Sequence, residues 1–140
     1  MNRAYNARSG FTLVEMLIVL AIMGIVIAVA VPGYLTFTRG AQKRATVGTL
    51  RNIKLAMERY REDVGDYPSS LRDLVKKPTD EKAEGWDGPY ISGKDEPKDG
   101  FGKNLHYSVT PEAENPYELY SYGRKGRGAP KEEWIDAWKQ

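Results

Sequence analysis

The feature that most constrains the fold is an almost unbroken apolar segment from Phe11 to Val31. As an α-helix it would extend roughly 31 Å at ~1.5 Å per residue, which matches the ~30 Å hydrocarbon core of a bilayer. Arg3 and Arg8 precede the segment, and no acidic residue does. Because basic residues beside a membrane span stay in the cytoplasm, the sequence predicts one span with a cytoplasmic N-terminus and residues 33–140 on the far side.

Three residues interrupt the apolar character of this part of the chain. Glu15 is a carboxylate inside the segment, and an Asp at the centre of a membrane helix costs roughly 2.5 to 3.5 kcal/mol. Such a residue is expected to have a functional partner. Gly24 lowers helix propensity, and Pro32 removes a backbone donor and clashes with the preceding turn. The last two residues predict a kinked or weakened stretch of helix.

Three interpretations of the apolar segment are open. Ala28-Val29-Ala30 fits the small-x-small cleavage site of an ordinary signal peptide, although the apolar stretch exceeds the usual ~7 to 15 residues. A simple signal anchor explains the length and the orientation but gives Glu15 no role. Finally, Arg8-Ser9-Gly10-Phe11-Thr12-Leu13-Val14-Glu15 resembles the processing site of type IV prepilins and of type II secretion pseudopilins.

The resemblance to prepilins implies a leader at residues 1–10, which a prepilin peptidase removes by cutting after Gly10. It also implies N-methylation of Phe11 and a mature membrane and assembly half-helix at residues 11–32. The cut creates an ammonium at Phe11, and pairing with Glu15 of a neighbouring subunit would offset the desolvation of both charges. Members of the family often lose helicity between Gly24 and Pro32 on assembly, and the same is expected here.

Beyond Pro32 the helix is expected to continue to about Glu62. Apolar residues recur there at spacings of three or four, which predicts one buried face; they are Val47, Leu50, Ile53, Met57, Tyr60 and Val64. Gly65 and Pro68 then end the helix.

The secondary-structure elements predicted after the long helix are short. Residues 71–75 predict a short helix capped by Ser69 or Ser70, and residues 79–104 read as a loop. Alternation predicts strands at 105–109 and 117–122, joined as a hairpin. The fold class is therefore α+β: a type IV pilin-like chain with a long N-terminal helix, a membrane-spanning first half, a small antiparallel sheet and a C-terminal loop region.

A narrower resemblance rests on motifs spread over the chain. They are Gly65-Asp66-Tyr67-Pro68, Trp86-Asp87-Gly88-Pro89-Tyr90, Asp99-Gly100-Phe101-Gly102 and Tyr117-Glu118-Leu119-Tyr120-Ser121. In this order they are similar to the major pseudopilin family of type II secretion. The chain has no Cys, whereas type IV pilins usually close their C-terminal region with a disulfide.

Membership of that family implies a structural subunit of a helical homopolymer, the pseudopilus, which drives folded proteins across the outer membrane. The implied partners are the prepilin peptidase, an inner-membrane assembly platform with its ATPase, minor pseudopilins and the secreted proteins. The implied location is the inner membrane, single-pass with a periplasmic C-terminal domain. Alternatives are a type IV pilus, a competence (DNA-uptake) pilus, and a monomeric membrane-anchored periplasmic binding domain.

Nucleic-acid binding and enzymatic activity are both predicted to be absent. A basic cluster at Arg124, Lys125, Arg127 and Lys131 lies near aromatic residues and could contact nucleic acid. However, the 21 Lys and Arg residues exceed the 19 Asp and Glu residues by only two, and removing the two leader arginines leaves a neutral mature chain. His106 is the single histidine, and no catalytic constellation accompanies it.

The last loop departs from the family. The resemblance implies a structural calcium there, held by backbone carbonyls and by two aspartates, one in a Gly-x-Asp-Gly segment and one before a late Ile. This chain instead has Gly123-Arg124-Lys125-Gly126, and Trp134 precedes Ile135. The favoured prediction is a metal-free loop in which the Lys125 ammonium faces loop carbonyls or Glu133. The alternative is a shifted calcium site, formed by Glu133 and Asp136 with the backbone of Leu119 and Ser121.

Overall fold

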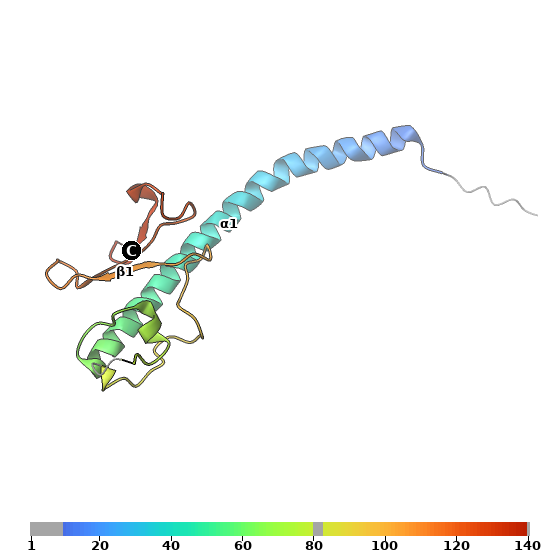
Figure 1. Cartoon of the computed structure of the whole chain (residues 1–140). Helices are drawn as coiled ribbons and strands as arrows, with labels where there is room; N and C mark the ends of the chain where they lie inside the picture. The colour runs from blue at the N-terminus through green and yellow to red at the C-terminus, as the bar shows by residue number, and fades with distance from the viewer. Residues whose placement is uncertain (1–9, 80–82, 140) are drawn as a thin grey trace, which may run out of the picture. The chain divides into compact units, whose positions relative to one another are not determined.

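The computed structural model describes residues 10–79 and 83–139, so residues 1–9 of the predicted leader lie outside the described residues. Its elements, shown in Figure 1, are helix α1 (Leu13–Val64), the 3-10 helices η1 (Leu71–Leu74) and η3 (Lys131–Glu133), and strands β1 (His106–Val109), β2 (Tyr117–Ser121) and β3 (Ile135–Asp136). The chain divides into two units, one ending at Thr38 and the other beginning at Arg39, and each is described separately.

In the first unit, α1 is apolar on all sides. Large apolar side chains from Phe11 to Phe37 are exposed, and the helix is long and apolar enough to cross a membrane. The expected candidate span is therefore present. Pro32 lies inside α1, and the helix is continuous through Gly24 and Pro32. The expected loss of helicity concerns the assembled filament and stays a prediction.

In the second unit, one face of α1 packs against a three-stranded antiparallel sheet in the order β1-β2-β3. His106 lies opposite Tyr120, and Ser121 lies opposite Ile135. The core joins residues of the helix, η1, the sheet and the turn after β3: Leu50, Ile53, Ala56, Met57, Tyr60, Leu71, Leu74, Tyr117, Leu119, Ile135 and Ala137. The expected α+β, pilin-like fold and both expected strands are confirmed, while the two-residue strand β3 was not predicted.

The buried face of α1 also includes Thr46, which the apolar pattern does not reveal. Its hydroxyl donates to the Gln42 carbonyl at 2.8 Å and accepts the Gly100 N–H at 3.0 Å. A Cβ on Gly100 would lie 2.2 Å from the Gln42 carbonyl oxygen, so only glycine lets this loop approach the helix so closely. The loop before β1 is thereby fixed to α1.

Tyr117 fills the centre of the core and supports a stability prediction. Its ring lies 5.0 Å from the rings of Tyr67 and Trp138, burial raises its pKa, and its hydroxyl has no hydrogen-bond partner among the described residues. Removing an unsatisfied buried hydroxyl relieves a desolvation penalty of ~1–3 kcal/mol. Tyr117→Phe is therefore expected to leave the free energy of unfolding unchanged or to raise it, as measured by thermal melting.

Tyr107→Phe is the matched control for that substitution. The Tyr107 hydroxyl donates to the Pro68 carbonyl at 2.7 Å, and losing such a bond typically costs ~0.5–1.5 kcal/mol. A larger loss of stability in Tyr117→Phe than in Tyr107→Phe would contradict the assignment of an unsatisfied hydroxyl to Tyr117.

Candidate functional site: the helix start and the C-terminal loop

The predicted cleavage site lies directly before the first turn of α1. Gly10 and Phe11 are exposed and outside the helix, so their peptide bond is not held in helical hydrogen bonds. Thr12 and Glu15 bracket the first turn: the Thr12 N–H donates to Glu15 Oε2 at 2.8 Å, and the Glu15 N–H donates to Thr12 Oγ1 at 3.2 Å. This reciprocal pair is a capping box. Glu15 therefore helps to begin the helix within its own chain.

Sequence reasoning did not identify Thr12, although the Thr-x-x-Glu spacing before an apolar run is the signal for such a box. The Thr12 hydroxyl also donates to Glu15 Oε2, at 3.1 Å, and no hydrogen bond from the described residues reaches Oε1. An ionised carboxylate has acceptor sites on both oxygens. Glu15 can thus keep its bonds to Thr12 and accept a further donor, such as an ammonium, through Oε1.

At the other end of the chain, two lysines hold the loop that follows β2. Lys125 Nζ lies 2.6 Å from Glu133 Oε1, and Lys103 Nζ donates to the Arg124 carbonyl. Gly123 and Gly126 adopt φ values of 71° and 81°, the left-handed region that glycine tolerates best. Sequence reasoning anticipated a pairing of Lys125 with Glu133 but missed Lys103, because nothing in its local pattern indicates a partner about twenty residues away.

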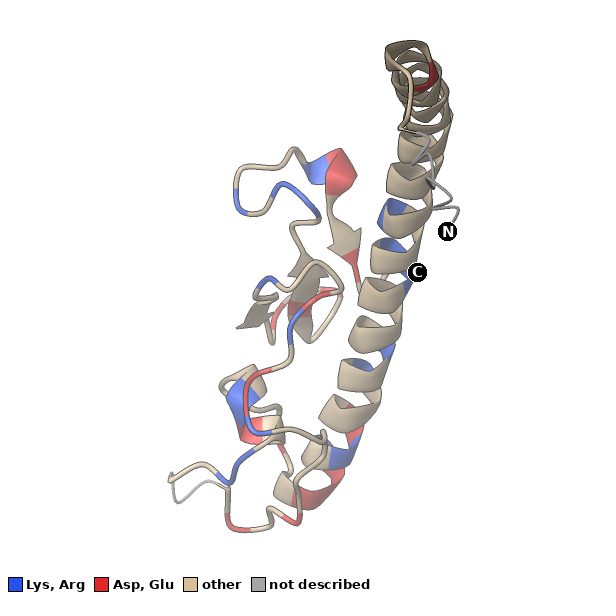
Figure 2. Cartoon of the chain, turned by 90° about the vertical axis from the view of Figure 1, so that its right-hand side faces the viewer, with Lys and Arg blue, Asp and Glu red and all other residues tan. Residues whose placement is uncertain are grey.

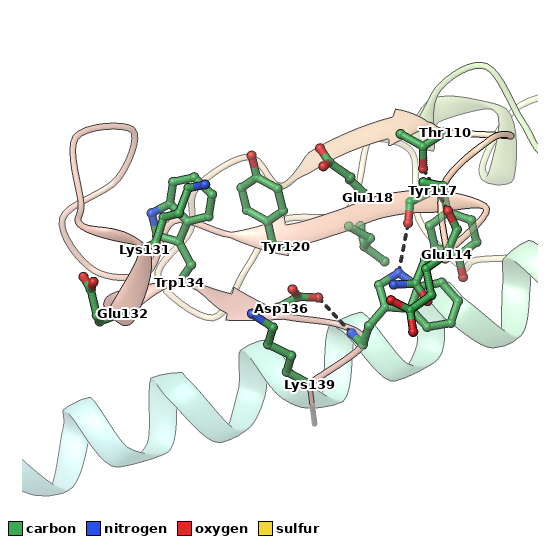
Figure 3. Close-up of a pocket in the computed structure, with 14 residues that line it drawn as sticks. Thr110, Glu114, Tyr117, Glu118, Tyr120, Lys131, Glu132, Trp134, Asp136 and Lys139 are labelled. Atoms are coloured by element: carbon green, nitrogen blue, oxygen red, sulfur yellow. Dashed lines mark hydrogen bonds between the residues drawn. The ribbon is translucent and has the colours of Figure 1, made fainter.

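The residues of this loop do not fit a calcium ion. Calcium binds several hard oxygens, including carboxylates, but Glu133 Oε1 already pairs with the Lys125 ammonium, whose positive charge would repel the ion. Asp136 Oδ1 accepts the Trp138 N–H at 2.9 Å (Figure 3), and the Leu119 carbonyl accepts the Ala137 N–H at 3.0 Å. In the described ranges 10–79 and 83–139, no group of three His, Cys, Asp or Glu residues could hold a metal.

A buried carboxylate connects this loop to the loop before β1. Asp99 is only 6% exposed; its Oδ2 accepts the Ser121 hydroxyl at 2.5 Å, and its Oδ1 accepts the backbone N–H groups of Phe101 and Lys103 at 3.0 and 2.8 Å. Ser121 Oγ in turn accepts the Gly123 N–H at 2.9 Å. One charged group therefore orders the segment that presents Lys103 and the start of the loop that carries Lys125.

A depression of about 510 Å³ in the second unit lies along β2 and the C-terminal segment (Figure 3). Charges of both signs line it: Glu114, Glu118, Glu132, Asp136, Lys131 and Lys139. Tyr120 stacks on Trp134 with ring centroids 4.5 Å apart. Burial, and to a lesser degree a hydrogen bond with Tyr122, raise the pKa of Tyr120 to about 12. The lining contains no nucleophile paired with a base, and we assign it no catalytic role.

Charge along α1 is asymmetric. The helix carries Arg39, Lys43, Arg44, Arg51 and Lys54 and has no acidic residue between Glu15 and Glu58, which appears as blue bands along α1 in Figure 2. These cations belong to the helix and are not part of the basic cluster that sequence reasoning singled out. In that cluster, Lys125 is paired with Glu133 and the Lys131 ammonium lies 5.8 Å from the centre of the Trp134 ring.

The long apolar-to-amphipathic helix, its capped start and the small antiparallel sheet define a class, the type IV pilin-like proteins. A model of the prokaryotic N-terminal methylation motif matches residues 5–31, and the family model for type II secretion system (T2SS), protein G, matches residues 34–138. The chain belongs to the type II secretion system protein G family.

Individual relatives agree with this assignment. The chain is 34% identical to type II secretion system core protein G of Pseudomonas aeruginosa, over 94% of this chain and 95% of that protein, and 31% identical to core protein G of Escherichia coli K12, over 89% and 87%. A fimbrial protein of Neisseria meningitidis is 40% identical over 45% of this chain and 37% of its own length.

The fold has also been seen in a solved structure. The major pseudopilin from the type 2 secretion system of enterohaemorrhagic Escherichia coli matches with a TM-score of 0.60 at 24% identity, covering 76% of this chain and 94% of that chain. At this identity the likeness concerns the fold alone.

Proposed function

We propose that the chain is the structural subunit of a type II secretion pseudopilus, the filament that drives folded proteins across the outer membrane. The observation that carries this proposal is the joining, in one chain, of a methylation-type N-terminus at residues 5–31 and a protein G domain at residues 34–138. The subunit acts by polymerising and not by catalysis.

Processing and assembly follow from the helix start. The prepilin peptidase cuts between Gly10 and Phe11, and Phe11 is N-methylated. The new ammonium at Phe11 pairs with Glu15 of a neighbouring subunit through the oxygen that Thr12 does not use. Both charges are then compensated inside the filament, where an isolated charge would be strongly disfavoured.

The location and partners follow from the same proposal. Before assembly, residues 11–32 span the inner membrane, with the N-terminus cytoplasmic and residues 33–140 periplasmic. The assembly platform and its ATPase extract the subunit, minor pseudopilins share the filament, and secreted proteins are its cargo. The stretch between Gly24 and Pro32, where Pro32 lacks a backbone donor, loses helicity as the subunit leaves the bilayer. Nucleic acid is not among the partners.

A secretion assay separates this proposal from its rivals. Deleting the gene in its own host is expected to leave type II cargo in the periplasm, and the intact gene restores cargo to the medium. Normal secretion combined with lost DNA uptake or lost surface fibres would instead identify a competence or type IV pilus. Normal secretion with a monomeric protein that never forms filaments would identify a membrane-anchored binding domain.

A further inference from the structure

The loop from Gly123 to Glu133 concentrates backbone carbonyls and a carboxylate on a small part of the surface. The Gly123 carbonyl accepts the Gly126 N–H at 3.1 Å, and the Gly126 carbonyl accepts the Gly128 and Ala129 N–H groups at 2.8 and 2.9 Å. The turns leave the Arg124 carbonyl and the Glu133 carboxylate to be satisfied by groups outside the loop backbone. Both acceptors lie at the surface, and a cation or a set of donors placed beside them would tie the loop to the groups that carry the donors.

Two ammonium groups from different segments supply that positive charge. Lys125 reaches Glu133 at 2.6 Å from within the loop, and Lys103 reaches the Arg124 carbonyl from the loop before β1. A Cβ on Gly126 would lie 3.1 Å from Lys103 Nζ, so the Lys103 side chain crosses closely over the turn. A lysine ammonium is a compact point charge with three donors, which suits it to bridge acceptors as a small cation does.

The backbone of Lys103 is itself held in place by a hydrogen bond. Its backbone N–H donates to the buried Asp99 carboxylate at 2.8 Å, and the same carboxylate accepts the hydroxyl of Ser121, which holds Gly123. At the far end of the loop, the Trp134 indole N–H donates to the Ala129 carbonyl at 2.9 Å. Hydrogen bonds thus hold the loop near Gly123 and near Ala129, and the two lysines contact the chain of this loop.

We propose that Lys103 and Lys125 form a built-in cationic clamp that orders residues 123–133 without a divalent metal ion. The order of this loop, and with it the surface that the loop presents, is then independent of calcium concentration. The clamp does not depend on the proposed role in secretion, because it concerns the folding of one chain.

The first test is a thermal melt of the full chain in detergent micelles, with millimolar calcium, millimolar magnesium or a chelator. Ligands that bind only the native state raise the melting temperature. The clamp is expected to give the same melting temperature in all three conditions, within about 1 °C. A calcium-specific rise of about 5 °C or more would overturn the proposal.

The second test measures hydrogen exchange in peptides that cover residues 123–133. Lys103→Met and Lys125→Met are each expected to speed exchange about twofold to fivefold, the range for the loss of one hydrogen bond at Lys103 or one exposed ion pair at Lys125. The matched control is Arg127→Met, because Arg127 is exposed in the same loop and forms no ion pair with a described residue. Equal exchange in the Arg127→Met and Lys125→Met variants would overturn the clamp.

The reversed pair Lys125→Glu with Glu133→Lys keeps the test decisive if a single variant folds poorly. It retains an ion pair between the same two positions, so exchange close to that of the unmodified chain is expected. Exchange as fast as in Lys125→Met would contradict the role given to this pair.

Discussion

Glu15→Gln is expected to be cleaved, methylated and inserted into the membrane normally, and yet to form few or no filaments. Glutamine can replace glutamate in a capping box, so the bonds to Thr12 that begin α1 are retained. What the substitution removes is the negative charge that the Phe11 ammonium of a neighbour would meet. Breaking one half of a buried ion pair costs ~3–5 kcal/mol, so the filament yield should fall at least about tenfold.

Glu15→Ala completes this experiment, because it removes both the cap and the charge. Filaments sheared from cells are quantified by electron microscopy and immunoblotting, and the membrane fraction is assayed for the processed chain. Both variants should fail to assemble to a similar degree. If Glu15→Gln assembles normally while Glu15→Ala does not, Glu15 acts as a helix cap and the intermolecular pair does not exist.

Asp99→Ala is expected to be the most destabilising single change of a polar residue in the second unit. It leaves the Ser121 hydroxyl and the N–H groups of Phe101 and Lys103 without their acceptor. Each unsatisfied buried donor costs ~1–3 kcal/mol, and the two backbone groups can be partly rehydrated, so a total loss of ~2–4 kcal/mol is expected. For a domain of about this size the melting temperature falls by ~10–20 °C.

Two further variants serve as comparisons for Asp99→Ala. Ser121→Ala removes one of the three donors and should cost less than Asp99→Ala. Asp95→Ala, in the same loop region but exposed, should change stability by no more than ~0.5 kcal/mol. Thermal melts of the full chain in detergent give the order, and an Asp99→Ala variant as stable as Asp95→Ala would show that the buried network contributes nothing.

The helix and its buried face were predictable because their signal is local. Leu50, Ile53, Met57 and Tyr60 recur at helical spacing, and all four are buried in the structure. Thr46 escaped this reasoning because its burial is produced by Gly100, which approaches from a distant loop. Strand β3 escaped because two residues are too few to show alternation, and its pairing with β2 depends on tertiary packing.

The candidate site residues divide in the same way. Gly10, Phe11 and Glu15 were predicted because their motif is contiguous, and the cap at Thr12 could have been predicted from the Thr-x-x-Glu spacing alone. The pairing of Lys125 with Glu133 was anticipated because Lys125 stands where the family pattern has an aspartate. Lys103 and Asp99 could not be placed, because their partners Arg124 and Ser121 lie about twenty residues away and only the folded chain brings them together.

The most direct test of the account is the intact mass of this chain in filaments sheared from cells. The expected mass is that of residues 11–140 with one methyl group on the amine of Phe11. A chain that starts at Met1 or at Val31, or that is recovered only from the membrane fraction and never from filaments, would contradict the proposal of a processed filament subunit.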